Sequence, residues 1–349
     1  MAAVMTEFAA SRGMECRLIS LNDTPELHRM SVGGREFVFT GCARAKGLFT
    51  TTGMKAARRG GKLVLAAHPN LGPVTQAMRL LAPRMKSIIC THGIEVWEPM
   101  SRLRKLALRS ANLVLAPSQA TADHVREDQK VPVSRIRVLR WALDPQFEEL
   151  VAAAAKSAPP ENWPKGRVVL TVGRWLASER YKGVDTLITA LPRLLTRWPE
   201  LQLAVVGDGD DRAWLEDLAQ RNGVRRHVHF LSGLSYAQLS ACYAACELFA
   251  LPSRGEGFGL VYIEAMAHGK PVIGGAHGGA PEVIEDGVTG YLVQHGDAIQ
   301  LATSIETLLM HPELARQMGG RGRQRVERDF RFSVFAKTFK KIVREQCES

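Results

Sequence analysis

The chain has 349 residues, of which 46% are hydrophobic and 23% charged, the proportions of a globular protein of about two domains. This composition excludes a disordered chain, a collagen-like fibre and a disulfide scaffold. No apolar run approaches the roughly 20 residues of a membrane-spanning helix, no secretory signal is expected, and the six cysteines form no CxxC pair, so we expect reduced thiols in a cytoplasmic protein.

The formal net charge of +11 is unevenly distributed along the chain. Lysine and arginine outnumber aspartate and glutamate in residues 1–150, whereas the two kinds balance over residues 151–325. This asymmetry predicts an anionic partner on one face: a membrane surface, a nucleic acid or a phosphorylated acceptor. A charge that only keeps the protein soluble is the alternative.

Strand and helix patterns alternate along the chain. It opens with a helical stretch, and the first predicted strand comes only at residues 16–20. Further apolar, β-rich runs predict strands at 62–67, 87–92, 112–117, 135–139, 168–173, 201–207, 227–231, 247–252 and 271–275. Helical spacing occupies the intervals, for example 183–197 and 235–246.

This alternation predicts parallel sheets built from right-handed βαβ units. Residues 151–166, with three prolines and little periodicity, predict a linker. The expected fold class is α/β, with two Rossmann-like, doubly wound parallel-sheet domains, 1–150 and 167–330, facing across a cleft. A ligand would bind there, at the carboxyl ends of the strands. Residues 331–349 predict a final helix.

The densest functional signal is the segment PSRGEGFGLVYIE at residues 252–264. A strand ends there, glycines allow a tight turn, and a helix follows. Free backbone NH groups at a helix N-terminus bind anions, so this turn could hold a diphosphate while the flanking carboxylates bind sugar hydroxyls. The candidate donor-binding residues are Glu256, Gly257, Phe258, Gly259, Leu260 and Glu264. An ordinary helix start with an acidic first turn is the alternative.

Two cations follow the strand at 168–173. Gly173 ends the strand, Arg174 comes next, and Lys182 precedes an apolar helix. Positive side chains on one loop would neutralise a diphosphate and stabilise it as a leaving group. Arg174 and Lys182 are therefore candidate catalytic and donor-binding residues. Solvated charges without a ligand are the alternative.

The acidic turn VVGDGDD at residues 205–211 has two interpretations. Asp208 and Asp210 have the Asp-x-Asp spacing of a metal site. We favour a turn in which Gly209 lets a nucleotide lie close to the backbone and Asp210 or Asp211 caps the next helix. This interpretation predicts a site without a metal ion.

A histidine lies at the end of a predicted strand in the first half of the chain. The strand at 87–92 delivers His92 to its carboxyl end. Histidine can donate a hydrogen bond or shuttle a proton near neutral pH, so His92 is a candidate catalytic residue. A structural histidine is the alternative.

These segments together resemble a known family. GEGFGLVYIEAMAHGKPVIGG, TVGR, YKG, VVGDGD and GGAPEVIEDGVTGYLV are similar to the family 4 (group 1) retaining glycosyltransferases, which have the GT-B fold. The resemblance covers residues 88–340 well and earlier residues loosely. It implies transfer of a hexose from a GDP- or UDP-linked sugar, with GDP-mannose among the candidates. The acceptor would be a glycan or lipid-linked glycan and the product α-configured, in the synthesis of cell-surface polysaccharide or glycolipid.

The resemblance also implies residue roles. Glu256 would contact hydroxyls of the donor sugar, and Glu264 would hold the ribose. His92 would lie beside the transferred sugar, and Leu234 falls where the family binds the base. The family retains configuration by same-face attack through a short-lived oxocarbenium-like ion pair and uses no metal or other cofactor.

Two terminal features accompany the resemblance. Family members usually open with a strand and a Gly-rich loop that lines the acceptor site, and this loop is missing here. The last helix, at about 331–346, resembles a tail that packs back on the N-terminal domain.

Other functions remain as alternatives. A nucleotide-sugar epimerase or another GT-B enzyme would have a similar fold, although no lysine and phosphate cup for pyridoxal are evident. A nucleic-acid-binding protein would explain the charge, but no aromatic-basic interleaving or zinc spacing supports it. An NAD oxidoreductase would need a GxGxxG turn after a strand, which the sequence lacks.

A basic stretch suggests where the protein works. Residues 100–111, MSRLRKLALRSA, place arginines and a lysine among leucines, and Arg79, Arg84 and Lys86 lie before the strand that carries His92. A basic rim of this kind would attach the protein reversibly to an anionic membrane on its cytoplasmic face. The alternative is that Leu103 and Leu106 pack this helix on its own sheet.

Overall fold

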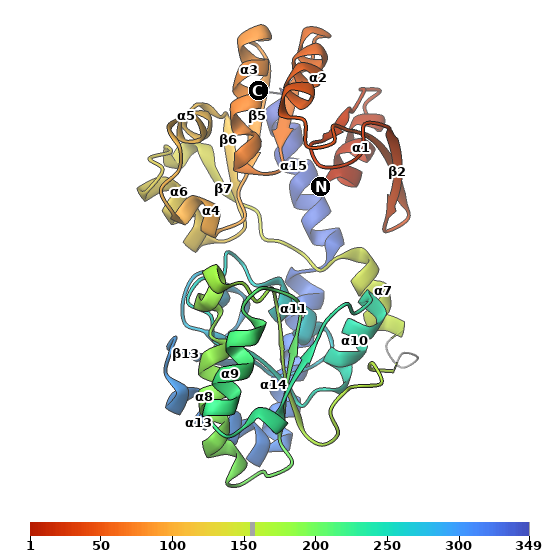
Figure 1. The fold of residues 1–349 in the computed structure, drawn as a ribbon. Helices are drawn as coiled ribbons and strands as arrows, with labels where there is room; N and C mark the ends of the chain where they lie inside the picture. Colours follow the sequence, from red (N-terminus) through yellow and green to blue (C-terminus); the bar gives the residue numbers. More distant parts are fainter. Residues whose placement is uncertain (154–157, 349) are drawn as a thin grey trace. The chain divides into compact units, whose positions relative to one another are not determined.

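The computed structural model describes residues 1–153 and 158–348 (Figure 1). Their contacts divide the chain into two units. Unit 1 comprises Met1–Arg140 with Phe332–Ser349, and unit 2 comprises Trp141–Arg331. The division falls before the linker expected at 151–166, because helix α7 (Pro145–Ala153) belongs to unit 2 and occupies the start of that segment. The predicted linker residues 154–157 lie outside the described part of the chain.

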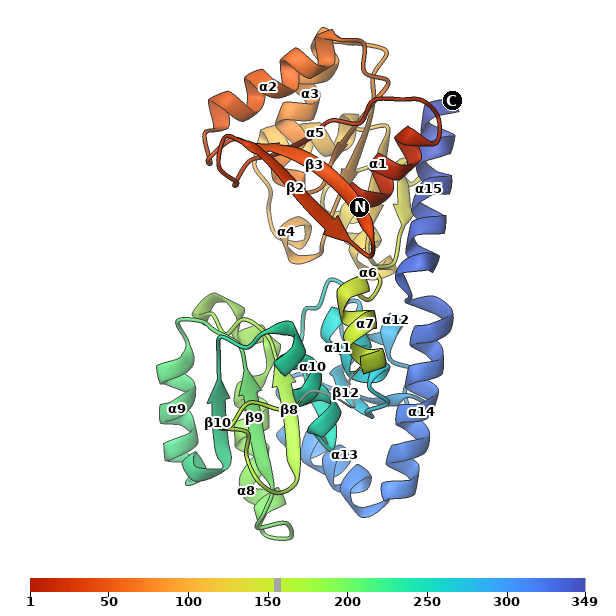
Figure 2. The ribbon, with the colours of Figure 1, turned by 90° about the vertical axis from the view of Figure 1, so that its right-hand side faces the viewer.

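Unit 2 is built on a six-stranded parallel sheet with the strand order β10-β9-β8-β11-β12-β13. Its strands are β8 (Val168–Val172), β9 (Gln202–Val206), β10 (Val228–Leu231), β11 (Leu248–Leu251), β12 (Val272–Gly275) and β13 (Gly290–Val293). Figure 2 shows β8, β9 and β10 side by side. The first five lie where the apolar runs predict them, because a sheet covered on both faces needs continuous hydrophobic strands. The sequence analysis missed β13.

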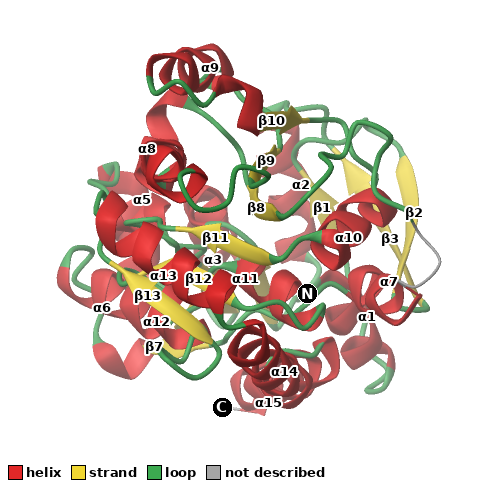
Figure 3. Cartoon of the chain, turned by 90° about the horizontal axis from the view of Figure 1, so that it is seen from below, coloured by secondary structure: helices red, strands yellow, loops and turns green. Residues whose placement is uncertain are grey.

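Helices cover both faces of this sheet (Figure 3). One layer contains α8 (Val184–Leu195), α9 (Arg212–Arg221) and α13 (Ala298–Met310), and the other contains α10 (Tyr236–Ala245), α11 (Leu260–Ala267) and α14 (Pro312–Asp329). Fully buried side chains such as Ile188, Leu203 and Phe249 fill the space between layers. Short helices complete the unit: η4 (Ala177–Lys182), η5 (Arg225–His227) and α12 (Ala280–Val283).

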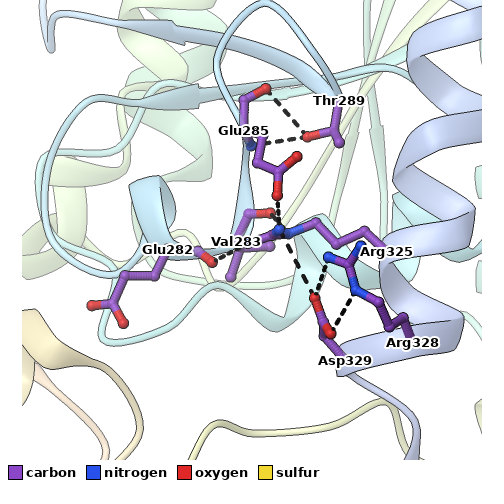
Figure 4. Close-up of polar contacts among 7 residues, drawn as sticks. All are labelled: Glu282, Val283, Glu285, Thr289, Arg325, Arg328 and Asp329. Atoms are coloured by element: carbon purple, nitrogen blue, oxygen red, sulfur yellow. Dashed lines mark hydrogen bonds and ion pairs between the residues drawn. The ribbon is translucent and has the colours of Figure 1, made fainter.

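Arg325 of α14 fixes the end of α12. Its guanidinium donates to the carbonyls of Glu282 at 2.9 Å and Val283 at 3.0 Å, and it pairs with the Glu285 carboxylate (Figure 4). Only 12% of its side chain is exposed. At the other end of α12, the amide of Gly279 donates to the carbonyl of residue 256 at 2.7 Å. Arg325 therefore supports the backbone that carries the glycine-rich turn.

Unit 1 contains a four-stranded parallel sheet with the strand order β4-β5-β6-β7. These strands are β4 (Leu63–Ala66), β5 (Lys86–Cys90), β6 (Leu113–Ala116) and β7 (Ile136–Val138), in the predicted positions. The helices of this part are α2 (Lys46–Arg58), η1 (Pro69–Leu71), α3 (Gly72–Leu81), α4 (Ile94–Trp97), α5 (Arg102–Ser110), α6 (Gln119–Glu127) and η2 (Val133–Arg135). α3 packs between α2 and α5.

The first predicted strand does not join that sheet. Helix α1 (Ala2–Ala10) leads to β1 (Leu18–Ser20), which pairs in parallel with β3 (Arg35–Gly41) in a separate sheet. β3 pairs in antiparallel fashion with β2 (Leu27–Val32) across a turn at Gly33–Gly34, where both glycines have positive φ. The sequence analysis missed this hairpin, although a Gly-Gly turn is a strong hairpin signal.

Helix α15 (Phe332–Glu348) belongs to unit 1 with the chain start. Lys340 donates to a carboxylate oxygen of Glu7 at 2.6 Å, and Arg35 donates to the other oxygen at 2.7 Å. The hydrogen bond from Lys340, followed by that from Arg35, lowers the pKa of Glu7. Arg137 of β7 pairs with Glu345 of the same helix. The final helix thus contacts α1 and the sheet edge of its own unit.

Candidate active site

The loop after β8 brings the two predicted cations together. An amino group of Arg174 donates to one oxygen of Glu179 at 2.7 Å, and Nζ of Lys182 donates to the other at 2.6 Å. Nζ of Lys182 also donates to the backbone carbonyl of residue 174 at 3.0 Å. Glu179 therefore bridges Arg174 and Lys182, a contact that the sequence analysis did not foresee.

The two cations differ in exposure. The side chain of Arg174 is 74% exposed, whereas that of Lys182 is only 12% exposed. The alternative that both cations are merely solvated charges is therefore wrong for Lys182. The ammonium group of Lys182 contacts Glu179 and lies near the ring of Trp175, with 5.9 Å between Nζ and the ring centroid.

The glycine-rich turn after β11 lies beside this cation loop. The amide of Arg254 donates to the carbonyl of Tyr181 at 2.8 Å. Gly183, with φ of +78°, approaches the backbone of Pro252 so closely that a Cβ would lie 2.6 Å from its carbonyl oxygen. Segments far apart in sequence thus form one surface at the carboxyl ends of β8 and β11.

Glu256 is the carboxylate of the glycine-rich turn on which the charge of Lys182 acts. Its Oε1 is buried and has no hydrogen-bond partner among the described residues. Burial raises the pKa of Glu256, while the charge of Lys182 and a hydrogen bond from Ser253 act in the opposite direction. A buried oxygen without a partner is costly, so the site holds an acceptor suited to a ligand hydroxyl.

The remaining turn residues are placed by the start of α11. Gly259, with φ of +99°, is its N-cap, and no side chain caps that end. Phe258 points into the core, with its ring 5.7 Å from that of Phe330. Phe258 can therefore offer a ligand only its backbone, as can Gly257 and Gly259. Leu260 is exposed.

Glu264, one turn into α11, has a partner that the sequence analysis missed. The hydroxyl of Tyr243 donates to its Oε2 at 2.8 Å. Burial raises the pKa of Glu264, and this hydrogen bond lowers it. Tyr243 is itself fully buried and stacks on His268, so it fixes the orientation of the carboxylate.

The acidic turn after β9 supports the cation loop. Asp210 accepts a hydrogen bond from the amide of Ala177 at 2.8 Å, and Asp211 pairs with Arg180 at 2.6 Å. Asp211 stands at the N-cap position of α9, as predicted, but neither aspartate side chain forms a capping hydrogen bond there. Gly209 lies close to the backbone of Trp175: a Cβ at Gly209 would lie 1.9 Å from the carbonyl oxygen of Trp175. The close contact that this glycine permits is therefore with protein backbone. This turn thus holds the loop that carries Arg174.

Leu234 lies in the loop between β10 and α10. Its side chain is partly buried against the core of unit 2. The next residue, Ser235, forms a capping box with Gln238 at the start of α10. The structure therefore gives this loop a fixed backbone, and it records no role for Leu234 beyond packing.

In unit 1, His92 follows β5 at its carboxyl end, as predicted. Its Nε2 contacts the carbonyl of Ala67 at 2.7 Å, and its amide donates to Glu95 at 2.5 Å. His68, which follows β4, stacks on His92 with 5.3 Å between ring centroids. Burial lowers the pKa of His68. The same strand-then-histidine pattern that revealed His92 could have revealed His68.

Helix α5 exposes its leucines. Leu103 is 68% exposed and Leu106 is 56% exposed, whereas Ala107 and Leu108 are buried. The alternative that Leu103 and Leu106 pack on the sheet is therefore wrong. Arg104 of the same helix is close enough to His68 for its charge to lower the pKa of that imidazole.

The basic rim is smaller than predicted. Lys86 begins β5 and Arg84 precedes it, so both lie at the amino end of the strand, about 13 Å of strand away from the end that carries His92. Arg79 donates to the carbonyl of Ser110 at 2.5 Å. The cations beside the exposed leucines are Arg102, Arg104 and Lys105. None of the described helices is long and apolar enough to cross a membrane.

Replacing Glu256 by glutamine should stabilise the unliganded protein, and the gain in unfolding free energy should grow as pH rises. Burial raises the pKa of Glu256, so the folded state holds this proton more tightly than the unfolded state. Such a group loses stability as pH rises through its unfolded and folded pKa values, and glutamine removes that loss. Unfolding free energy measured by urea at pH 4.5, 6 and 8 should show the E256Q advantage growing toward pH 8.

The matched control is Glu306→Gln, because Glu306 pairs with Arg193 elsewhere in unit 2. This change should give no gain at pH 8. An E256Q protein that is less stable than wild type at pH 8 would contradict the inferred environment of Glu256.

Known proteins resemble the chain over nearly its whole length. The family model for glycosyl transferases group 1 matches residues 155–325, and that for glycosyltransferase family 4 matches residues 2–147. A GDP-mannose-dependent alpha-(1-6)-phosphatidylinositol monomannoside mannosyltransferase of Mycolicibacterium smegmatis is 33% identical over 315 residues, covering 77% of this chain and 80% of the relative.

Solved structures agree with these matches. Sucrose-phosphate synthase from Thermosynechococcus elongatus superimposes with a TM-score of 0.76 at 25% identity, covering 98% of this chain and 92% of that one. Anabaena HepE, solved with UDP-glucose, has a TM-score of 0.71 at 23% identity, covering 85% and 82%, and shows the shared fold. The chain therefore belongs to the group 1, or family 4, glycosyltransferases and is a hexosyltransferase with the GT-B fold.

Proposed function

We propose that this glycosyltransferase transfers a hexose, with GDP-mannose as the first donor to test, to a lipid-linked or other glycan acceptor with retention of α configuration. The M. smegmatis relative is named as GDP-mannose-dependent and as acting on a phosphatidylinositol monomannoside, which favours this donor and a lipid-linked acceptor. A UDP-linked donor is the second candidate, because HepE was solved with UDP-glucose. The proposed setting is glycolipid or polysaccharide synthesis at the cytoplasmic face of a membrane, without nucleic acid.

One observation carries the proposal: a bridged cation pair lies on the same loop surface as a buried carboxylate oxygen that has no hydrogen-bond partner within the described residues. Arg174 and Lys182 suit a diphosphate, and Glu256 suits sugar hydroxyls. The first turn of α11, also in unit 2, adds backbone amides that could bind the phosphates. Glu264, oriented by Tyr243, is the proposed ribose ligand.

In the proposed reaction the bond between the anomeric carbon and the diphosphate oxygen breaks first. The electron pair stays on the diphosphate, where Arg174 and Lys182 stabilise the added charge. The acceptor hydroxyl attacks the oxocarbenium-like carbon on the same face and gives its proton to the departing phosphate oxygen. His92 keeps the role that the family resemblance implies, beside the transferred sugar, and its exposed ring contacts the carbonyl of Ala67 and stacks on His68.

The acceptor side is proposed to dock on an anionic membrane. Leu103 and Leu106 are exposed on α5, and Arg102, Arg104 and Lys105 surround them. Apolar side chains enter the interface while nearby cations attract anionic lipids, at about 1 kcal/mol for each cation.

Replacing Arg174 by alanine should weaken binding of GDP and UDP roughly 30-fold without a matching loss of stability. A charge-assisted hydrogen bond contributes about 1.5–3 kcal/mol, whereas this exposed side chain contributes little to folding. Calorimetric titration measures the affinity, and a melting curve measures the stability. Arg193→Ala is the control, since Arg193 is also an exposed arginine paired with a glutamate. Equal affinity of R174A and wild type would refute the diphosphate site.

Donor use should survive removal of divalent cations. In the proposed site Arg174, Lys182 and the start of α11 supply the positive charge, so hydrolysis and transfer with GDP-mannose, UDP-glucose and other nucleotide sugars should proceed at nearly the same rate in EDTA. Release of nucleoside diphosphate from each donor is the measurement. An absolute need for Mn²⁺ or Mg²⁺ would instead favour a metal site at Asp208.

The double variant Leu103→Ser/Leu106→Ser should partition about tenfold less to vesicles that contain anionic lipid, because two exposed leucines lose their apolar contact with the interface. Co-sedimentation with and without anionic lipid measures this. Ile299→Ser on α13 is the control, since Ile299 is equally exposed in unit 2. Binding that ignores lipid charge, or persists unchanged in high salt, would leave a soluble acceptor as the better proposal.

A further inference from the structure

The cation pair already shares an internal carboxylate. Glu179 accepts from Arg174 through Oε1 and from Lys182 through Oε2, at 2.7 and 2.6 Å. The side chains of Glu179 and Lys182 are 14% and 12% exposed, so the contact between them is largely shielded from water. A shielded ion pair is screened little by salt, and its two partners depend strongly on each other.

Glu179 is also part of a wider charge balance. Burial is the largest influence on the pKa of Glu256 and raises it. The positive charges of Lys182 and Arg174 lower this pKa, and the negative charge of Glu179 raises it. All four groups therefore lie within electrostatic reach of one another. Two cations face two carboxylic acids, so Glu179 offsets much of the positive charge on which a diphosphate would depend.

The reaction changes the charge of the bound diphosphate. In a nucleotide sugar both phosphates are esterified and each carries a single negative charge. After transfer the terminal phosphate is free, and because its second ionisation has a pKa near 6 it gains about one further charge near neutral pH. An unopposed cation pair would hence hold the product more tightly than the donor and delay its release.

We propose that Glu179 is an internal counter-ion that competes with the terminal phosphate for Arg174 and Lys182 and so promotes release of the nucleoside diphosphate. This rests on the proposed function, in which those cations bind the donor diphosphate. Glu179 is a positioning residue in this role, because it acts through the two cations and not on the sugar.

The test compares wild type with Glu179→Gln. Glutamine keeps the size of the side chain and removes its charge, so the largely buried Lys182 is left without a charged partner on its loop. Titration with GDP, UDP and inorganic pyrophosphate should show affinities about tenfold tighter in E179Q. Guanosine and uridine, which lack phosphate, should bind equally to both proteins. In steady-state assays the Ki for the nucleoside diphosphate should fall more than the KM for the nucleotide sugar.

A role in folding alone would not produce these results, since a loosened loop would bind phosphates more weakly. Glu306→Gln is the matched control, because it removes the charge from another glutamate paired with an arginine, and its affinities should equal those of wild type. Melting curves without ligand establish that each variant is folded. Glu179→Ala, which should also bind more tightly, keeps the test decisive if E179Q does not fold.

The outcomes separate this inference from the proposed function. If wild type binds the diphosphates, R174A weakens that binding and E179Q binds equally or more weakly, the counter-ion role is wrong and the donor site stands. If wild type binds none of GDP, UDP and pyrophosphate, both fail.

Discussion

Close backbone contact among three loops determines how the candidate site residues of unit 2 are arranged. These loops follow β8, β9 and β11 at the carboxyl ends of one sheet. At Gly209 and Gly183 the neighbouring carbonyl oxygens would lie 1.9 and 2.6 Å from any added Cβ, so a larger residue would force the loops apart. This backbone packing brings together the loops that carry Arg174, Lys182 and Glu256, and the ion pairs of the two cations with Glu179 then orient their side chains.

The same packing leaves some polar groups poorly satisfied. The Oε1 of Glu256 is buried without a partner among the described residues, whereas the largely buried Lys182 donates to Glu179 and to the carbonyl of residue 174. The buried oxygen of Glu256 lowers the stability of the unliganded protein, and a ligand that supplies a hydroxyl can recover that energy. In contrast, Glu264 has Tyr243 as a partner and Asp211 has Arg180. Among the proposed ligand contacts, Glu256 thus has an oxygen with no partner in the described part of the chain, whereas Glu264 already has a protein partner.

The sequence predicts the buried strands and the residues at their ends well. A continuous apolar run such as 168–172 and the glycine after it can be recognised within a short stretch of sequence. β13 escaped because it is only four residues long and begins with glycine. The strands at 27–32 and 35–41 escaped because their half-exposed faces mix polar and apolar residues. The Glu179 bridge and the Tyr243 contact depend on tertiary packing, and nothing in their spacing reveals them. The family resemblance adds expectations that spacing leaves open, such as the proposed positions of His92 beside the sugar and Leu234 beside the base.

Helix α15 gives unit 1 a dependence on the order of synthesis. Unit 2 is continuous in sequence, whereas unit 1 combines Met1–Arg140 with Phe332–Ser349. Glu7 and Arg137 reach their partners on α15 only after nearly the whole chain has been made. Residues 1–140 of unit 1 are made long before α15, so α1 and β7 lack that helix until synthesis ends. A chain truncated before Phe332 would keep every strand of unit 2 and leave unit 1 without α15.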